Sequence, residues 1–159
     1  MKPEHIIKSL AGTWSLINST YYKYEDLSTP SSNNTKQVGL LIYSPNGYVS
    51  ANFVSTEPEQ RPPHLIANQP DNGTDAEWAQ IGKYALAYSG PFSINASVPA
   101  TRRKGHILHG PLFVANLPSL ENKILARNYL VFEEGGVQYL NLSISGNVQR
   151  ADVLWKRIA

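Results

Sequence analysis

Hydrophobic and polar residues alternate along most of this chain, in short runs separated by Gly, Pro and Asn. Alternation of this kind is typical of β-strands with one buried face. It predicts strands at 12–24, 37–44, 47–54, 90–98, 105–116, 123–133, 136–145 and 149–158. Two turn sequences, Ser44-Pro45-Asn46-Gly47 and Glu134-Gly135-Gly136, would join neighbouring strands as hairpins. Short strands in such a series predict an antiparallel sandwich or barrel.

Two segments have helical spacing instead. Residues 3–10 place their apolar side chains on one face, which predicts a short helix over a sheet or barrel end. Residues 74–88 open with Thr74 and Glu77 at the spacing of a capping box, and Gly90 would end this second helix. Between the strands and this helix, residues 55–73 hold four prolines, which exclude a central strand. The long connection favours a functional lid, with a tolerated surface insertion as the alternative.

The hairpin around residues 44–47 lets its side chains be sorted by face. We expect Tyr43 to oppose Tyr48 across the turn. One face would then hold Leu41, Tyr43, Tyr48, Ser50 and Asn52. The other face would hold Leu40, Ile42, Val49, Ala51 and Phe53. The alternation leaves open which of the two faces points inward.

Composition narrows the class of protein. The chain has 159 residues, of which 42% are hydrophobic and 16% charged, and this excludes a disordered chain. No apolar run approaches the ~18 residues of a transmembrane helix. The absence of cysteine excludes disulfides, thiolate metal sites and cysteine nucleophiles. Charged side chains stand where a secretion signal would have its apolar stretch, so we expect a cytoplasmic protein.

The charge pattern gives no sign of a nucleic-acid partner. The net charge is only +2. The single basic run, Arg102 to Lys104, lies beside Gly105, which suits a solvated turn better than a basic stripe on a binding face. We therefore predict neither a nucleic-acid nor a membrane partner. A homodimer stays an open alternative, because nothing in the sequence fixes the oligomeric state.

Several short motifs follow one another along nearly the whole chain. They are Leu10-Ala-Gly-Thr-Trp-Ser-Leu, Gly39-Leu-Leu-Ile-Tyr-Ser-Pro-Asn-Gly-Tyr-Val-Ser-Ala, Tyr84-Ala-Leu-Ala-Tyr-Ser-Gly, Arg127-Asn-Tyr-Leu-Val and Val153-Leu-Trp-Lys-Arg. In this order the chain resembles the small lipocalin-like domain proteins of fungi and bacteria. The resemblance implies one all-β domain over 1–159, an antiparallel barrel of about eight strands that holds a ligand, with an N-terminal helix and one capping helix. It also implies that Trp14 closes the barrel base under Arg157 or Lys156.

Most acid–base chemistry is unsupported by the positions of the titratable residues. Of the acidic residues, only Asp152 lies inside a predicted strand, since Glu133 stands at the end of one beside its turn. A pair of catalytic carboxylates therefore has no obvious site in the lumen. His106 and His109 are three residues apart on a strand and face opposite sides, which argues against a shared metal ion. Phosphate-binding glycine loops and a Gly-x-Ser-x-Gly pattern are absent. We predict no metal and no cofactor.

The remaining candidates are few. Arg127 shares a predicted strand face with apolar neighbours and Tyr129, where a guanidinium needs a partner, water or a ligand oxygen. The alternative is an exposed face with Arg127 in water. His109 is the best base near neutral pH, with a structural role beside Gly110-Pro111 as its alternative. We therefore predict that the catalytic residues are Arg127, Tyr129 and His109. The residues predicted to contact the ligand are Tyr43, Asn52, Phe53, Trp78, Tyr84 and Tyr88.

Two functions fit this picture. The first is a cofactor-independent enzyme, of the isomerase, cyclase or dehydratase type, acting on a hydrophobic small molecule of secondary metabolism. The second is an intracellular carrier of such a molecule, without catalysis. Classical carrier lipocalins are exported and this chain shows neither a secretion signal nor disulfides, so the resemblance favours the enzyme.

Overall fold

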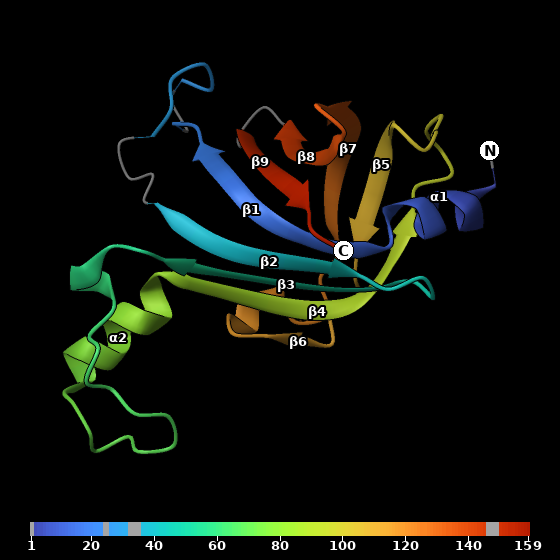
Figure 1. Cartoon of the computed structure of the whole chain (residues 1–159). Coiled ribbons are helices and arrows are strands. Elements are labelled where there is room, and N and C mark those ends of the chain that lie inside the picture. Colours follow the sequence, from blue (N-terminus) through green and yellow to red (C-terminus); the bar gives the residue numbers. More distant parts are fainter. Residues whose placement is uncertain (1, 24–25, 32–35, 146–149) are drawn as a thin grey trace.

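The computed structural model describes residues 2–23, 26–31, 36–145 and 150–159. Within them, eight antiparallel strands close into a barrel in the order β3-β2-β1-β9-β8-β7-β5-β4, with β4 returning to β3 (Figure 1). The barrel strands are β1 (Gly12–Tyr21), β2 (Gln37–Tyr43), β3 (Tyr48–Ser55), β4 (Ala85–Ile94), β5 (Lys104–His109), β7 (Leu125–Glu134), β8 (Val137–Ser145) and β9 (Arg150–Arg157). The remaining elements are α1 (Pro3–Leu10), α2 (Asp75–Lys83), β6 (Val114–Ala115), which pairs with β4, and the short 3-10 helices η1 (Pro58–Gln60) and η2 (Pro118–Leu120). The predicted fold class is confirmed.

The helix α1 lies at one end of the barrel, as its sequence predicted (Figure 1). Leu10 is buried there, and its carbonyl oxygen accepts a hydrogen bond from Trp14 Nε1 at 3.1 Å. The Arg157 guanidinium lies 4.5 Å from the Trp14 ring centroid and donates to two carbonyl oxygens at the end of α1. Of the two basic residues that the resemblance offered for Trp14, Arg157 is therefore the one that packs over it.

The second helix is shorter than predicted. Its capping box forms, since Thr74 and Glu77 each accept a hydrogen bond from the other's backbone nitrogen. The helix ends at Lys83, however, because the chain from Ala85 onward pairs with β3. The apolar residues among 85–88 fit the spacing of a strand as well as that of a helix. These residues form a strand because they pair with β3. Gly90 lies inside β4, where an added Cβ would come 2.9 Å from the carbonyl oxygen of Pro111.

The predicted sorting of faces at the 44–47 hairpin is wrong by one residue. Tyr43 opposes Val49 rather than Tyr48, and Gly47 adopts a φ of 88°, which favours glycine. A shift of one residue exchanges the two faces of β3. The inward residues are Leu41, Tyr43, Val49, Ala51 and Phe53, all buried. The outward residues are Leu40, Ile42, Tyr48, Ser50 and Asn52.

Other strand boundaries also differ from the prediction. The strand predicted at 90–98 ends at Ile94, and the one predicted at 12–24 ends at Tyr21. The predicted strand 105–116 is divided after His109 by the cis peptide bond between Gly110 and Pro111, and β6 then pairs with β4. Positions 24 and 149, at the ends of two predicted strands, lie outside the described residues. The Gly135-Gly136 turn joins β7 to β8 as predicted. No helix in the described ranges is long and apolar enough to span a membrane.

The proline-rich segment and α2 project from the barrel (Figure 1). None of the α2 residues is buried. Trp78 ties the helix to the preceding segment by donating from Nε1 to the carbonyl oxygen of Pro70 at 2.9 Å. The segment expected to form a lid therefore packs mainly on its own helix.

Candidate ligand-binding cavity

A small cavity lies at the end of the barrel opposite α1, where β1 ends and β4 begins. Its volume is about 50 Å³. The apolar part of its wall consists of Phe53, Leu86, Leu142, Ile144, Ala151 and Val153. Tyr21, Tyr88, Arg127 and Trp155 carry its polar groups. This space holds a few water molecules, so a larger ligand enters only when wall side chains move.

Arg127 is the charged residue of this wall. It is half-buried and precedes the first described pair of the β7–β8 ladder, Asn128 with Ser143. Its side chain lines both the cavity and a depression on the outside of β7 and β8. Its Nη1 donates to the carbonyl oxygen of Ala126 at 2.8 Å. Among the described residues no carboxylate pairs with Arg127, whose guanidinium therefore keeps donors for a ligand oxygen.

The charge of Arg127 acts on the polar groups around it. Burial raises the pKa of Tyr88 to about 12, and Arg127 partly opposes that shift. Burial also raises the pKa of Tyr21, and the charge of Arg127 again partly opposes that rise. Burial, reinforced by Arg127, lowers the pKa of His109 to about 3. The end of the barrel around Arg127 is thus positive, and its histidine is neutral at pH 7.

His109 lies behind Tyr88 rather than in the cavity. It ends β5 and is completely buried. Its Nε2 lies 2.6 Å from the Tyr43 hydroxyl, and its Nδ1 lies 3.1 Å from the Tyr88 hydroxyl. Both ring nitrogens are therefore engaged, and neither faces a ligand directly. Of the three residues predicted to be catalytic, Arg127 lies in the cavity wall. His109 lies behind that wall, with Tyr88 between it and the cavity.

Tyr129, the third predicted catalytic residue, lies elsewhere. It lies on the same face as Arg127, as predicted, and that face points inward, but Tyr129 does not line the cavity. Its hydroxyl donates to the carbonyl oxygen of Thr101 at 2.5 Å. Burial raises the pKa of Tyr129 to about 12. We predicted that Arg127 and Tyr129 act together on the substrate. In the structure only Arg127 lines the cavity, and the Tyr129 hydroxyl is bonded to Thr101 instead.

The residues predicted to contact the ligand divide into three groups. Phe53 and Tyr88 line the cavity, and Tyr43 is buried behind it. Asn52 is exposed on the outer face of β3, because of the register at the hairpin. Trp78 and Tyr84, which with Tyr88 were assigned to the second helix, lie outside the cavity wall.

Sequence reasoning missed the whole of the cavity wall formed by β8 and β9. Ala151, Val153 and Trp155 alternate along β9, so period-two spacing was the signal that could have found them. Tyr21 had no such signal, because a β-bulge between Leu16 and Asn18 reverses the alternation of β1. The Trp155 Nε1 is buried and has no hydrogen-bond acceptor within the described part of the chain.

The polar groups of the cavity wall are mostly donors. Arg127 offers guanidinium N–H groups, Trp155 an indole N–H, and Tyr88 a hydroxyl. No Asp or Glu is among the described residues that line the cavity. Nor do the described residues contain a cluster of His, Asp or Glu that could hold a metal ion. The wall is thus suited to an apolar molecule that brings an acceptor oxygen.

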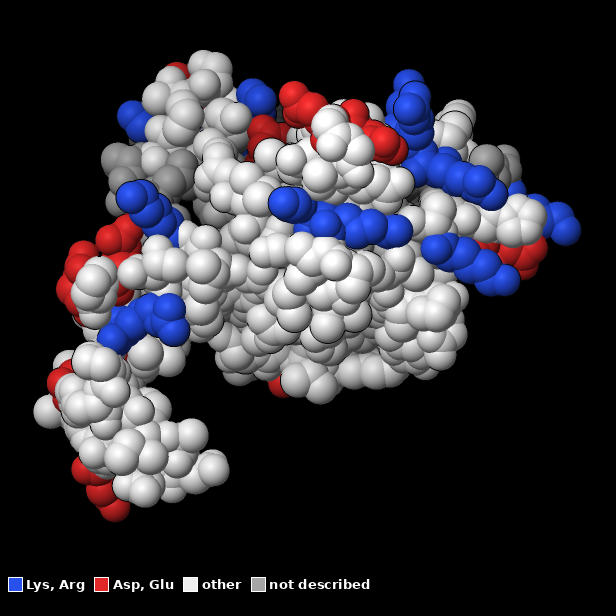
Figure 2. Space-filling model, in the orientation of Figure 1, with Lys and Arg blue, Asp and Glu red and all other residues white. Residues whose placement is uncertain are grey.

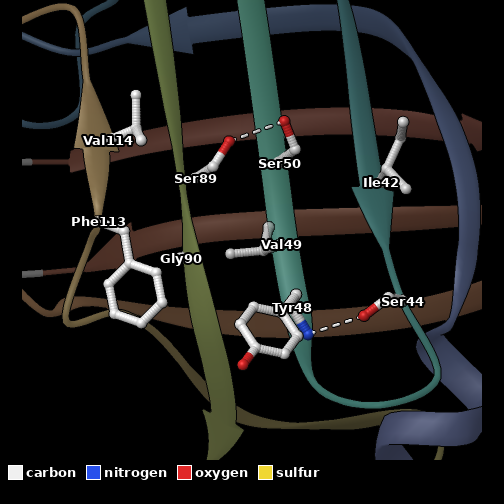
Figure 3. Close-up of a pocket in the computed structure, with 9 residues that line it drawn as sticks. All are labelled: Ile42, Ser44, Tyr48, Val49, Ser50, Ser89, Gly90, Phe113 and Val114. Atoms are coloured by element: carbon white, nitrogen blue, oxygen red, sulfur yellow. Dashed lines mark hydrogen bonds between the residues drawn. The ribbon is translucent and has the colours of Figure 1, made fainter.

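A second depression, of about 300 Å³, lies on the outside of the barrel over β2, β3 and β4 (Figure 3). Tyr48 and Phe113 lie at one end of it, and their ring centroids are 6.5 Å apart. On its floor the Ser89 hydroxyl donates to the Ser50 hydroxyl at 3.0 Å. Figure 2 shows no Lys or Arg over the β3, β4 and β6 region of this view. The outer depression offers apolar surface without a charged group, so the inner cavity is the stronger candidate site.

Comparison with known proteins agrees with this architecture. No curated protein and no solved structure matches the chain significantly. A family model described as a lipocalin-like domain matches residues 11–158, which is nearly the whole chain. The closed barrel, the Trp14–Arg157 contact at its base and the small cavity at its other end are in keeping with that match. The chain therefore belongs to the lipocalin-like domain family.

Proposed function

We propose that this protein is a cofactor-independent enzyme that binds a hydrophobic small molecule in the barrel and polarises one of its oxygens with Arg127. The observation that carries the proposal is a guanidinium without a described carboxylate partner in a largely apolar wall. A carbonyl, enolate or carboxylate oxygen would take the place of the missing partner. The molecule belongs, in this proposal, to secondary metabolism.

The arrangement suits reactions that need a polarised oxygen and a held shape. Withdrawing electron density from a carbonyl lowers the barrier to enolisation and to cyclisation, and donors fixed in advance need no reorganisation during the reaction. The apolar wall would fold a flexible substrate and exclude water. An isomerase that works by enolisation and a dehydratase both also need a base, and no carboxylate lines the described wall. A cyclase, or an isomerase that rearranges bonds without removing a proton, therefore fits better.

The second candidate is a carrier that binds the same kind of molecule without catalysis. It is favoured by the position of His109, whose two ring nitrogens are bonded to Tyr43 and Tyr88. With its best base engaged, the cavity would hold a ligand oxygen and leave the ligand unchanged. Turnover of a candidate substrate by the wild-type protein separates the enzyme from the carrier.

Both candidates rest on Arg127, which a pair of probes can test. Acetophenone and ethylbenzene have similar shapes, but only acetophenone has an oxygen. A charge-assisted hydrogen bond contributes about 1.5–3 kcal/mol, or roughly 10- to 150-fold in Kd. We expect wild type to prefer acetophenone and Arg127→Leu to lose that preference. Arg127→Lys should restore little, since an ammonium lacks the planar fork.

The matched control is Arg102→Leu, which removes an exposed arginine from a turn. It should leave both affinities unchanged. Arg127→Leu should retain the stability of wild type, because it removes a partly buried charge that has no ion-pair partner among the described residues. An acetophenone preference that survives in Arg127→Leu would contradict the proposed role of Arg127.

A further inference from the structure

Three side chains form a hydrogen-bonded chain from the core to the cavity. Tyr43 of β2 bonds to His109 Nε2 at 2.6 Å, and Tyr88 of β4 bonds to His109 Nδ1 at 3.1 Å. Tyr43 and His109 are completely or almost completely buried, whereas Tyr88 lines the cavity. Within the described part of the chain, these are the polar partners of the three groups. The chain thus has one end in the core and one at the cavity.

The burial of Tyr43 decides the direction of the hydrogen bonds. A neutral imidazole has one N–H donor and one acceptor nitrogen, and His109 is neutral because burial lowers its pKa to about 3. The Tyr43 hydroxyl has no described acceptor other than Nε2, so its proton points to that nitrogen. The opposite arrangement would leave the Tyr43 proton buried without an acceptor, which is costly. His109 therefore carries its own proton on Nδ1.

This direction determines what Tyr88 can do. The Nδ1–H of His109 donates to the Tyr88 oxygen, and the Tyr88 proton must then find a different acceptor. Of the three residues, Tyr88 is the one that lines the cavity, together with Arg127 and Tyr21. A ligand oxygen in the cavity, or water in its absence, is the acceptor that remains.

We infer that Tyr88 is the second donor to the ligand oxygen that Arg127 binds, and that His109 is a positioning residue that turns the Tyr88 hydroxyl toward the cavity. The inference rests on the proposed function and adds the hydroxyl that completes the oxygen site. Tyr88 donates a hydrogen bond and keeps its proton, because its own burial raises its pKa and opposes a phenolate. The site therefore stabilises charge on a ligand oxygen as an oxyanion hole does.

The tautomer of His109 tests this inference without any ligand. Long-range ¹H–¹⁵N correlation spectra of the ¹⁵N-labelled full chain distinguish a protonated Nδ1 from a protonated Nε2. The expected result at pH 7 is a neutral His109 ring with its proton on Nδ1. A proton on Nε2 would overturn the inference, because Tyr88 would then donate to the ring instead of the cavity.

A variant tests the consequence for binding. We expect Tyr88→Phe to reduce the affinity ratio of acetophenone to ethylbenzene about fivefold, the effect of one neutral hydrogen bond. The matched control is Tyr48→Phe, which removes the same hydroxyl from the outer surface and should leave the ratio unchanged. If Arg127→Leu abolishes the ratio and Tyr88→Phe does not reduce it, the inference is overturned and the proposed function stands. If neither variant changes the ratio, the proposed function fails as well.

Discussion

Buried, neutral His109 gives the protein a specific sensitivity to acid. The pKa of His109 is about 3 in the folded protein and 6.5 in the reference state that represents the unfolded chain. Between these pH values the unfolded chain binds one more proton at this site, so stability falls as pH falls. The slope approaches 1.4 kcal/mol per pH unit. From pH 7 to pH 4 the loss due to His109 amounts to about 3 kcal/mol.

The groups facing His109 explain why its ring stays neutral. Tyr43 and Tyr88 occupy its two nitrogens, and Arg127 adds a positive charge nearby. None of these groups stabilises an imidazolium as a carboxylate would. A loss of about 3 kcal/mol is a large part of the 5–15 kcal/mol that stabilises a typical domain.

The assay is urea unfolding at pH 7, 6, 5 and 4, followed by tryptophan fluorescence. His109→Gln removes the titrating group, so we expect this variant to lose about 3 kcal/mol less than wild type between pH 7 and pH 4. His106→Gln, three residues away and on the outer face of β5, is the matched control and should follow wild type. Equal losses in wild type and His109→Gln would refute the reasoning.

Two predictions concern stability away from the cavity, and both are read from urea unfolding at pH 7. Arg157→Lys should cost about 1–2 kcal/mol, because an ammonium cannot both cover the Trp14 ring and reach two carbonyl oxygens; an unchanged midpoint would contradict this. Gly90→Ala should cost about 1–3 kcal/mol, since its Cβ would contact the Pro111 carbonyl. Gly82→Ala meets nothing within 4 Å in α2 and should be neutral or stabilising, and a loss equal to that of Gly90→Ala would argue against the clash.

The barrel could be predicted because local patterns and global pairing agree over most of the chain. The alternation along β7 correctly placed Arg127 and Tyr129 on one face, and the structure shows that this face points inward. The capping box at Thr74 correctly placed the start of α2. The end of α2 could not be predicted, because the residues after Lys83 fit both periods and only their pairing with β3 makes them a strand.

The cavity was harder to predict than the fold. Its wall depends on register, and a single residue at the hairpin before Tyr48 exchanged the faces of β3, which moved Asn52 to the outer surface. The bulge in β1 likewise turned Tyr21 inward. The pairing of His109 with two tyrosines joins strands distant in the sequence. Hydrophobic periodicity predicts which residues share a face of one strand, but it does not predict contacts between residues of different strands.

The central claim is that the cavity holds a ligand oxygen between the donors of Arg127 and Tyr88. The most direct measurement is the infrared carbonyl stretch of ¹³C-labelled acetophenone bound to the full chain. Hydrogen bonds to two donors weaken the C=O bond, so we expect the bound ketone to absorb at a lower frequency than in hexane, and Arg127→Leu to reverse most of that shift. A bound ketone that absorbs at its hexane frequency, or one whose frequency is the same in Arg127→Leu, would contradict the account.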